Sequence, residues 1–129
     1  MAKVLGVGGI FFKAKDPAKL GKWYQTWLGV DINPDWGGTA FMPSTMPEGG
    51  YTVFAPFKGD TTYFEPSKQA FMINLIVDNL DDALAQVQEG GAELVGDPQD
   101  DDYGKFGWFI DPDGNKIELW QPNKSLPQT

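Results

Sequence analysis

The chain lacks two chemically versatile residues, since its 129 amino acids include no cysteine and no histidine. The missing cysteine excludes disulfides, zinc–thiolate sites, iron–sulfur clusters and a cysteine nucleophile. The missing histidine removes the commonest protein metal ligand and the commonest general base, so no histidine-dependent catalytic triad can form. No apolar run approaches the roughly 20 residues of a membrane-spanning helix. We therefore expect a soluble protein located in the cytoplasm.

Positive charge is also scarce. Ten basic residues face 18 acidic ones, which gives a net charge of -8. Such a surface repels nucleic acid and anionic lipid, so neither is an expected partner. A neutral or cationic small molecule is compatible with this charge, and we expect a small-molecule ligand.

The first half of the chain carries the signals of one helix among several strands. Asp16 is a predicted helix N-cap and is followed by Pro17, a proline suited to the first helical turn. Apolar residues then recur at helical spacing until Gly29, which predicts the end of the helix. Alternating or apolar segments predict the strands at 7–14, 30–32, 39–42 and 51–57.

The second half repeats this order. A polar connector at 58–70 precedes a strand at 71–77, and Asn79 is then a predicted N-cap for a helix that ends at Gly90 and Gly91. Three further strands are predicted at 92–95, 104–111 and 116–121.

Shifting the sequence by 63 positions places Ile10 on Ile73 and Asp16 on Asn79. This internal repeat predicts two βαβββ modules. We expect an α+β fold in which curved mixed sheets surround a concave cup, with the helices outside. A module of about 60 residues buries too little surface to be stable alone, so both modules should share one domain. The predicted boundaries are 1–129 for the domain, 7–57 and 71–122 for the modules, 58–70 for the connector and 123–129 for a tail.

Side-chain alternation assigns the predicted strands two faces. The apolar face expected to lie under the helices contains Ile10, Phe12, Ala14, Ile73, Leu75, Val77, Ile117 and Leu119. The opposite face contains Gly9, Phe11, Lys13, Met72, Asn74, Ile76, Glu118 and Trp120. Because the second set mixes aromatic, polar and acidic groups, it fits a ligand-lined surface better than a sealed core.

Three segments carry a family resemblance: the helix DPAKLGKWYQTWLG, the stretch FMINLIVDNLDDALAQVQEGGAEL and the ending YGKFGWFIDPDGNKIELWQP. Together with the repeated strand order they resemble the glyoxalase, bleomycin-resistance and dioxygenase superfamily, also called vicinal oxygen chelate proteins. The resemblance extends from about Val7 to Pro122. It implies a homodimer, often with each cup built from the first module of one chain and the second of its partner.

Metal-dependent members of that superfamily hold a divalent ion with one residue on the first and one on the fourth strand of each module. By position, these places correspond here to Gly9, Val53, Met72 and Glu118. Only Glu118 offers a ligand for a hard cation, because glycine and valine have none and a thioether suits soft metals. The resemblance therefore implies a degenerate metal site, and we expect no metal and no other cofactor.

Glu118 is a single acid on an otherwise apolar strand, and three interpretations remain open. It is a remnant of a metal site whose charge is met by Lys13 or Lys116, a recognition group for a cationic or hydrogen-bonding ligand, or a base whose pKa is raised by apolar walls. Unpaired burial of its charge costs several kcal/mol, so a partner, a ligand or solvent is expected beside it.

Seven residues form the predicted ligand site, and Glu118 is also the candidate catalytic residue. They are Phe11, Val53, Met72, Asn74, Trp108, Glu118 and Trp120. Trp23, Tyr24 and Trp27 lie on one stripe of the first helix and are assigned to the core. The acidic run from Asp97 to Asp102 lacks calcium-loop spacing and is predicted to be a solvated loop. The loop residues Tyr63 and Tyr103 are candidates for the rim of the cup, and nothing in the sequence decides whether they lie there.

These patterns favour a glyoxalase-like protein that binds or sequesters a small cationic or neutral aromatic molecule. The alternative is an enzyme of the same superfamily, a lyase, isomerase or dioxygenase, with Glu118 as its base or with an unrecognised metal site. A module whose cup is filled by its own side chains, and which acts through protein contacts, is the third possibility.

Overall fold

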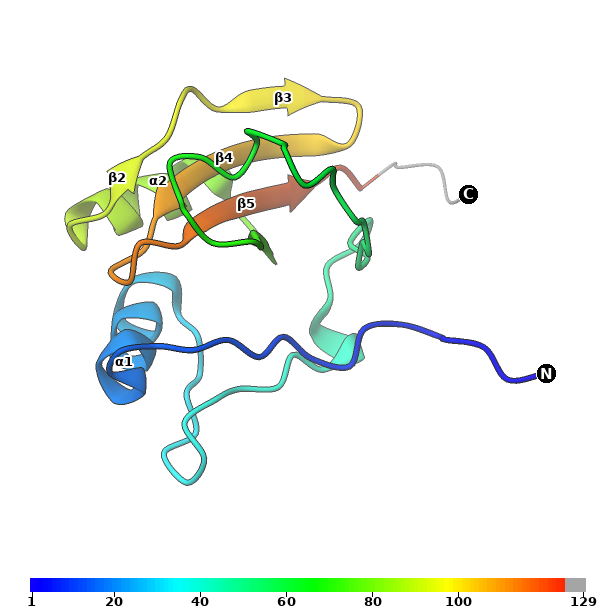
Figure 1. The fold of residues 1–129 in the computed structure, drawn as a ribbon, viewed down its shortest axis with the longest axis horizontal. Coiled ribbons are helices and arrows are strands. Elements are labelled where there is room, and N and C mark those ends of the chain that lie inside the picture. Colours follow the sequence, from blue (N-terminus) through cyan, green and yellow to red (C-terminus); the bar gives the residue numbers. More distant parts are fainter. Residues whose placement is uncertain (125–129) are drawn as a thin grey trace.

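In the computed structural model, which describes residues 1–124, the chain is an α+β protein with two helices against one mixed sheet (Figure 1). Most of the predicted tail, 123–129, lies outside the described residues. Neither helix within them has the length and apolar character needed to cross a bilayer.

Both helices begin and end where their local signals predict. Helix α1 spans Pro17–Leu28, and the side chain of Asp16 accepts a hydrogen bond of 3.1 Å from the backbone N–H of Lys19. Helix α2 spans Leu80–Glu89, and Asn79 caps it in the same way through the N–H of Asp82, at 3.0 Å. The caps satisfy backbone donors that have no partner within the helix.

The sheet is built almost entirely from the second half of the chain. Its strands are β1 (Ile73–Ile76), β2 (Glu93–Leu94), β3 (Gln99–Asp101), β4 (Gly104–Ile110) and β5 (Lys116–Pro122). The order is β1-β5-β4-β2, with β3 also paired to β4. β1 runs parallel to β5, and the other pairs are antiparallel.

One face of this sheet packs under the helices, as the alternation predicts for the second half. Ile117 and Leu119 on β5 and Phe109 on β4 are at most 1% exposed. They form one core with the buried faces of α1 and α2. Residues of β5 between them, including Glu118, therefore point to the other face.

The prediction of two βαβββ modules is wrong for the first module, whose strands do not form. Residues 7–14, 30–32, 39–42 and 51–57 contain no strand, and the one further element there is a short 3-10 helix, η1 (Pro43–Thr45). Ile10 and Phe12, expected in the core, are 56% and 42% exposed. A helix cap needs only neighbours along the chain, whereas a strand needs a distant ladder partner, and these segments have none within the described chain.

The acidic run also differs from expectation. Residues Gln99–Asp101 form the strand β3, paired with β4, where a loop was predicted. All three residues are exposed, so their solvation was correctly predicted. The carboxylates of Asp100 and Asp101 stay in water, so forming the strand does not cost their desolvation. The negative charge of this run therefore does not prevent its backbone from pairing with β4.

Candidate functional site

The face of the sheet turned away from the helices places an amide, an indole and a carboxylate side by side. Strand register sets Trp108 of β4 directly opposite Glu118 of β5, and Asn74 of the parallel strand β1 opposite Glu118 on its other side. Side chains on directly paired strand positions lie within reach of one another. Three of the seven predicted site residues are thus neighbours.

Glu118 is half-buried, and its carboxylate accepts hydrogen bonds from three neutral donors. The Asn74 amide donates to Oε1 at 2.7 Å, and the Trp108 indole N–H donates to Oε2 at 2.8 Å. The Tyr63 hydroxyl also donates to Oε2, from the connector rather than from the sheet. A carboxylate has about four acceptor positions, so roughly one stays open.

Tyr63 lies across this part of the sheet with further aromatic contacts. Its ring is perpendicular to that of Trp108, with centroids 6.3 Å apart, and stacks on Phe57 at 5.8 Å. Figure 1 shows the green segment that leads into β1 crossing in front of β4 and β5. Burial and the hydrogen bond to Glu118 raise the pKa of the Tyr63 hydroxyl, so the phenol stays protonated at neutral pH.

Lys116 is the cation of this site. Its side chain is 7% exposed, and its Nζ donates to the backbone carbonyl of Tyr63. The same ammonium lies 5.0 Å from the Tyr63 ring centroid and 5.9 Å from the Trp108 ring centroid, within the range of cation–π attraction. Burial lowers the pKa of Lys116, and the charge of nearby Glu118 opposes that shift.

Trp120 continues the same face of β5 but belongs to a neighbouring aromatic cluster. Its ring stacks on Phe106, with centroids 5.9 Å apart, and is steeply inclined to the Tyr51 ring, with centroids 5.0 Å apart and an angle of 74°. Its indole N–H donates to the backbone carbonyl of Tyr103 at 2.8 Å. Because its ring contacts Phe106 and Tyr51 and its N–H is engaged, Trp120 forms a wall beside Glu118 rather than a free stacking surface.

The remaining predicted site residues lie outside the five strands. Phe11 is 94% exposed and Val53 is 65% exposed, and both lie in segments without strands. Met72 is half-buried and directly precedes β1. Gly9 is exposed and lies outside the sheet.

The model of the glyoxalase-like domain family matches residues 9–120. The chain belongs to this family. No protein with a curated function matches it.

The solved structures similar to this glyoxalase-like chain include the following two. TnmS3, an antibiotic-binding protein from Streptomyces sp. CB03234, has 21% identity and a TM-score of 0.56, covering 95% of this chain and 100% of its own. A glyoxalase/bleomycin resistance protein/dioxygenase superfamily member from Sphaerobacter thermophilus DSM 20745 is 34% identical. That match covers 38% of this chain and 40% of the other, with a TM-score of 0.35. The first neighbour supports the glyoxalase-like fold.

The divalent metal used by members of the superfamily does not fit the residues of this glyoxalase-like chain. Among residues 1–124, no three acidic, histidine or cysteine side chains gather into a possible metal site. Of the four positions that correspond to the metal ligands, only Glu118 carries a hard ligand, and its two oxygens already accept three hydrogen bonds. We therefore derive no chemistry through a metal.

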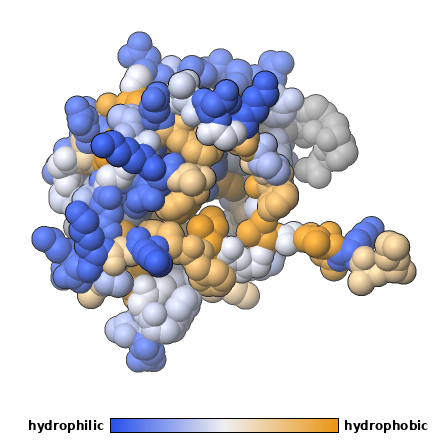
Figure 2. Space-filling model, viewed as in Figure 1, coloured by the Kyte–Doolittle hydropathy of each residue, from blue (hydrophilic) through white to orange (hydrophobic). Residues whose placement is uncertain are grey.

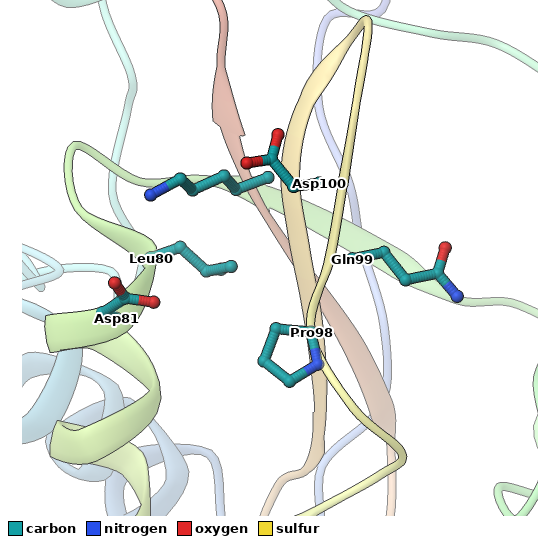
Figure 3. A pocket seen from close by; sticks show the side chains of 6 residues that line it. Leu80, Asp81, Pro98, Gln99 and Asp100 are labelled. Atoms are coloured by element: carbon teal, nitrogen blue, oxygen red, sulfur yellow. The ribbon is translucent and has the colours of Figure 1, made fainter.

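Two surface hollows lie away from Glu118. One, of about 200 Å³, opens between the start of α2 and β3, where the close-up shows Asp81 and Asp100 from facing elements (Figure 3). The other, of about 240 Å³, joins Lys13 and Lys15 to Asp113 of the DPDG turn. Neither contains a predicted site residue.

Sequence reasoning left Tyr63 unplaced and treated Lys116 only as a possible counter-charge for Glu118. The structure makes Tyr63 a direct partner of Glu118, 55 residues away along the chain. A local signal existed, because Tyr63 and Phe64 are aromatic residues within an otherwise polar connector. One of the three interpretations of Glu118 pairs it with a lysine, and in the structure three neutral donors contact its carboxylate instead.

Proposed function

We propose that this glyoxalase-like protein binds a small organic molecule, a cationic or neutral aromatic compound, over the sheet face around Glu118. In this proposal the protein holds its ligand without a metal and without transforming it. The observation that carries the proposal is the Glu118 carboxylate, held by Asn74, Trp108 and Tyr63 beside aromatic rings. A few convergent polar groups among apolar walls are typical of small-molecule sites.

The likeness to TnmS3, itself an antibiotic-binding protein, is consistent with this proposal at the level of the fold. Binding of a drug-like molecule by sequestration needs walls and a recognition group but no reacting residue. The sheet face around Glu118 has the aromatic rings of Trp108 and Trp120 as walls, against which Tyr63 and Tyr51 now lie.

The alternative of a lyase, isomerase or dioxygenase with Glu118 as base has weaker support. A general base must aim a free lone pair at the proton that it removes. Three of about four acceptor positions on Glu118 already receive donors, which leaves about one position to take a proton, whereas a bound ligand needs that position only as a hydrogen-bond acceptor. Holding a ligand requires only the fourth position or the displacement of one donor.

We also propose that the protein works as a homodimer. Large hydrophobic side chains are exposed along the first half of the chain, and among the described residues 17 of the 18 such side chains lie at or before Phe71. Figure 2 shows hydrophobic residues gathered in the middle of one face, with hydrophilic residues around them. Soluble monomers rarely expose apolar area on this scale, so a second copy of the chain is the occupant that we propose.

The binding proposal is tested by a thermal-shift screen of cationic and neutral aromatic compounds against the wild-type protein, Glu118→Gln and Glu93→Gln. Glu93 is an exposed acid on β2, so its variant controls for the loss of one negative charge. A ligand at 100 times its dissociation constant stabilises a protein by about 2.7 kcal/mol. We expect hits with the wild type and with Glu93→Gln, and at least about tenfold weaker binding by Glu118→Gln.

Glu118→Gln should also lose about 1–3 kcal/mol of unfolding free energy, because glutamine cannot accept all three hydrogen bonds. If Glu118→Gln is more stable than the wild type and binds the same compounds equally well, Glu118 is a remnant and the proposal fails. The absence of any hit would also count against it.

A further inference from the structure

One side chain from outside the sheet already occupies the Glu118 site in the way a ligand would. Tyr63 comes from the connector, and its hydroxyl donates to Glu118 Oε2 while its ring lies edge-to-face with Trp108. The ring is not sealed in, since the residue is 39% exposed. If it left, an aromatic-sized position open to solvent would appear beside Glu118.

The charges around that position discriminate between ligand classes. Lys116 Nζ lies 5.0 Å from the centre of the Tyr63 ring, so an aromatic ring placed there meets a cation at its face. The electron-rich face of a neutral ring attracts such a cation, whereas a positively charged ligand would be repelled by it. Glu118 Oε2, in turn, already accepts the Trp108 N–H and needs an O–H or N–H donor where Tyr63 now stands.

Resting on the proposed binding function, we infer that the ligand is a neutral hydroxylated aromatic compound, a phenol, which displaces Tyr63. The phenol ring takes the place of the tyrosine ring between Lys116 and Trp108, and its hydroxyl donates to Glu118. Tyr63 is then an internal competitor that sets the affinity of the site, and Glu118 disfavours rings without a hydroxyl donor.

Competition by Tyr63 has a definite thermodynamic consequence. The apparent dissociation constant equals the intrinsic constant divided by the fraction of molecules in which Tyr63 has left the site. Removing the side chain raises that fraction to one, so phenols should bind more tightly. Every ligand of the vacated position gains by the same factor. The preference for a hydroxyl donor comes from Glu118, because a hydrogen bond to a charged group contributes about 1.5–3 kcal/mol, which is tenfold or more in affinity.

The test is an NMR titration that follows the indole N–H signal of Trp108 in the full chain, with three probes. These are 4-methylphenol, 4-methylanisole, which lacks the donor, and 4-methylbenzylamine, which is cationic. The proteins are the wild type, Tyr63→Ala and the control Tyr103→Ala, which removes a tyrosine that is 57% exposed and belongs to the second half. Tyr63→Phe keeps the ring and serves if Tyr63→Ala does not fold.

We expect 4-methylphenol to bind Tyr63→Ala at least about tenfold more tightly than the wild type, with Tyr103→Ala matching the wild type. Tyr63→Phe should show a smaller gain, because its ring remains while its hydroxyl is lost. In every protein, 4-methylanisole should bind at least about tenfold more weakly than 4-methylphenol.

Equal binding of 4-methylphenol and 4-methylanisole, or no gain on removing Tyr63, would overturn the inference. A response to 4-methylbenzylamine alone would also overturn it, yet would leave the proposed binding function standing. If no aromatic probe, neutral or cationic, binds to any of the proteins, the binding function itself fails.

Discussion

At the scale of single residues, Asp111 shows how a buried charge is tolerated. It is 4% exposed, and four donors reach its carboxylate. Three come from the turn that it begins, namely the N–H groups of Asp113 and Asn115 and the Asn115 amide. The fourth is the Tyr24 hydroxyl on α1, at 2.8 Å. The carboxylate therefore joins the turn to a helix far away in the chain.

Tyr24→Phe removes that link and leaves Asp111 with one donor fewer. We expect the unfolding free energy in urea to fall by about 1.5–3 kcal/mol, the usual contribution of a hydrogen bond to a charged group. Tyr103→Phe is the matched control, because its hydroxyl is on an exposed side chain and its loss should change stability by less than about 0.5 kcal/mol.

The stability difference between the wild type and Tyr24→Phe should also depend on pH. Burial and the charge of Asp111 raise the pKa of the Tyr24 hydroxyl far above its ordinary value. A pKa raised in the folded state stabilises the fold fully below the unfolded pKa, about 10 for tyrosine, and this contribution is lost as the pH rises above it. The stability difference between the wild type and Tyr24→Phe should shrink between about pH 10 and pH 11, and a constant difference would contradict the assignment.

At the scale of secondary-structure elements, β4 begins at a glycine that lies against its neighbour's backbone. Gly104 has a φ of 127°, and a Cβ there would lie 2.2 Å from the carbonyl oxygen of Gln121 on β5. Gly96 also has positive φ, at 68°, but a Cβ there would meet no atom within 4 Å. Substituting each glycine in turn therefore distinguishes the cost of a positive φ from the cost of placing a side chain between two closely spaced strands.

Gly96→Ala should cost about 1 kcal/mol of unfolding free energy, the strain of positive φ alone. Gly104→Ala should cost at least about 3 kcal/mol, since the strand pair must also separate around the new methyl group. Urea unfolding measures both. Equal losses would mean that β4 and β5 do not approach as closely as the structure has them.

At the scale of the whole molecule, the two halves of the chain differ in how well they bury their apolar residues. The second half places Ile117, Leu119 and Phe109 in a core with at most 1% exposure, whereas Phe11 and Phe54 in the first half are 94% and 84% exposed. Apolar surface of this extent favours association. The proposed homodimer follows from this imbalance.

Phe54→Glu tests that proposal by sedimentation equilibrium. Because the side chain is exposed in the single chain, the change should alter the stability of one copy by less than about 0.5 kcal/mol. A charge buried unpaired in an interface costs several kcal/mol, so we expect a wild-type dimer to become a monomer. Tyr103→Glu, an exposed position in the second half, should stay dimeric. A wild-type protein that is monomeric at high concentration would contradict the proposal.

The sequence by itself determined the parts of this protein whose causes are local. Asp16 and Asn79 cap their helices through residues three positions away, and both helices and all four strands predicted in the second half are confirmed apart from small shifts at their ends. Alternation along β5 likewise separated Glu118 from the core residues on either side of it.

Only the tertiary structure decided the features that depend on distant partners. The first-half strands were predicted from the same alternation, but a strand exists only where another backbone completes its hydrogen bonds, and residues 7–57 meet none in the described chain. The contact between Tyr63 and Glu118 joins a connector to a strand, and no period along the chain encodes it. Side-chain alternation and helix caps are short-range physics, whereas the residue that contacts Glu118 from outside the sheet is set by how the connector folds over the sheet.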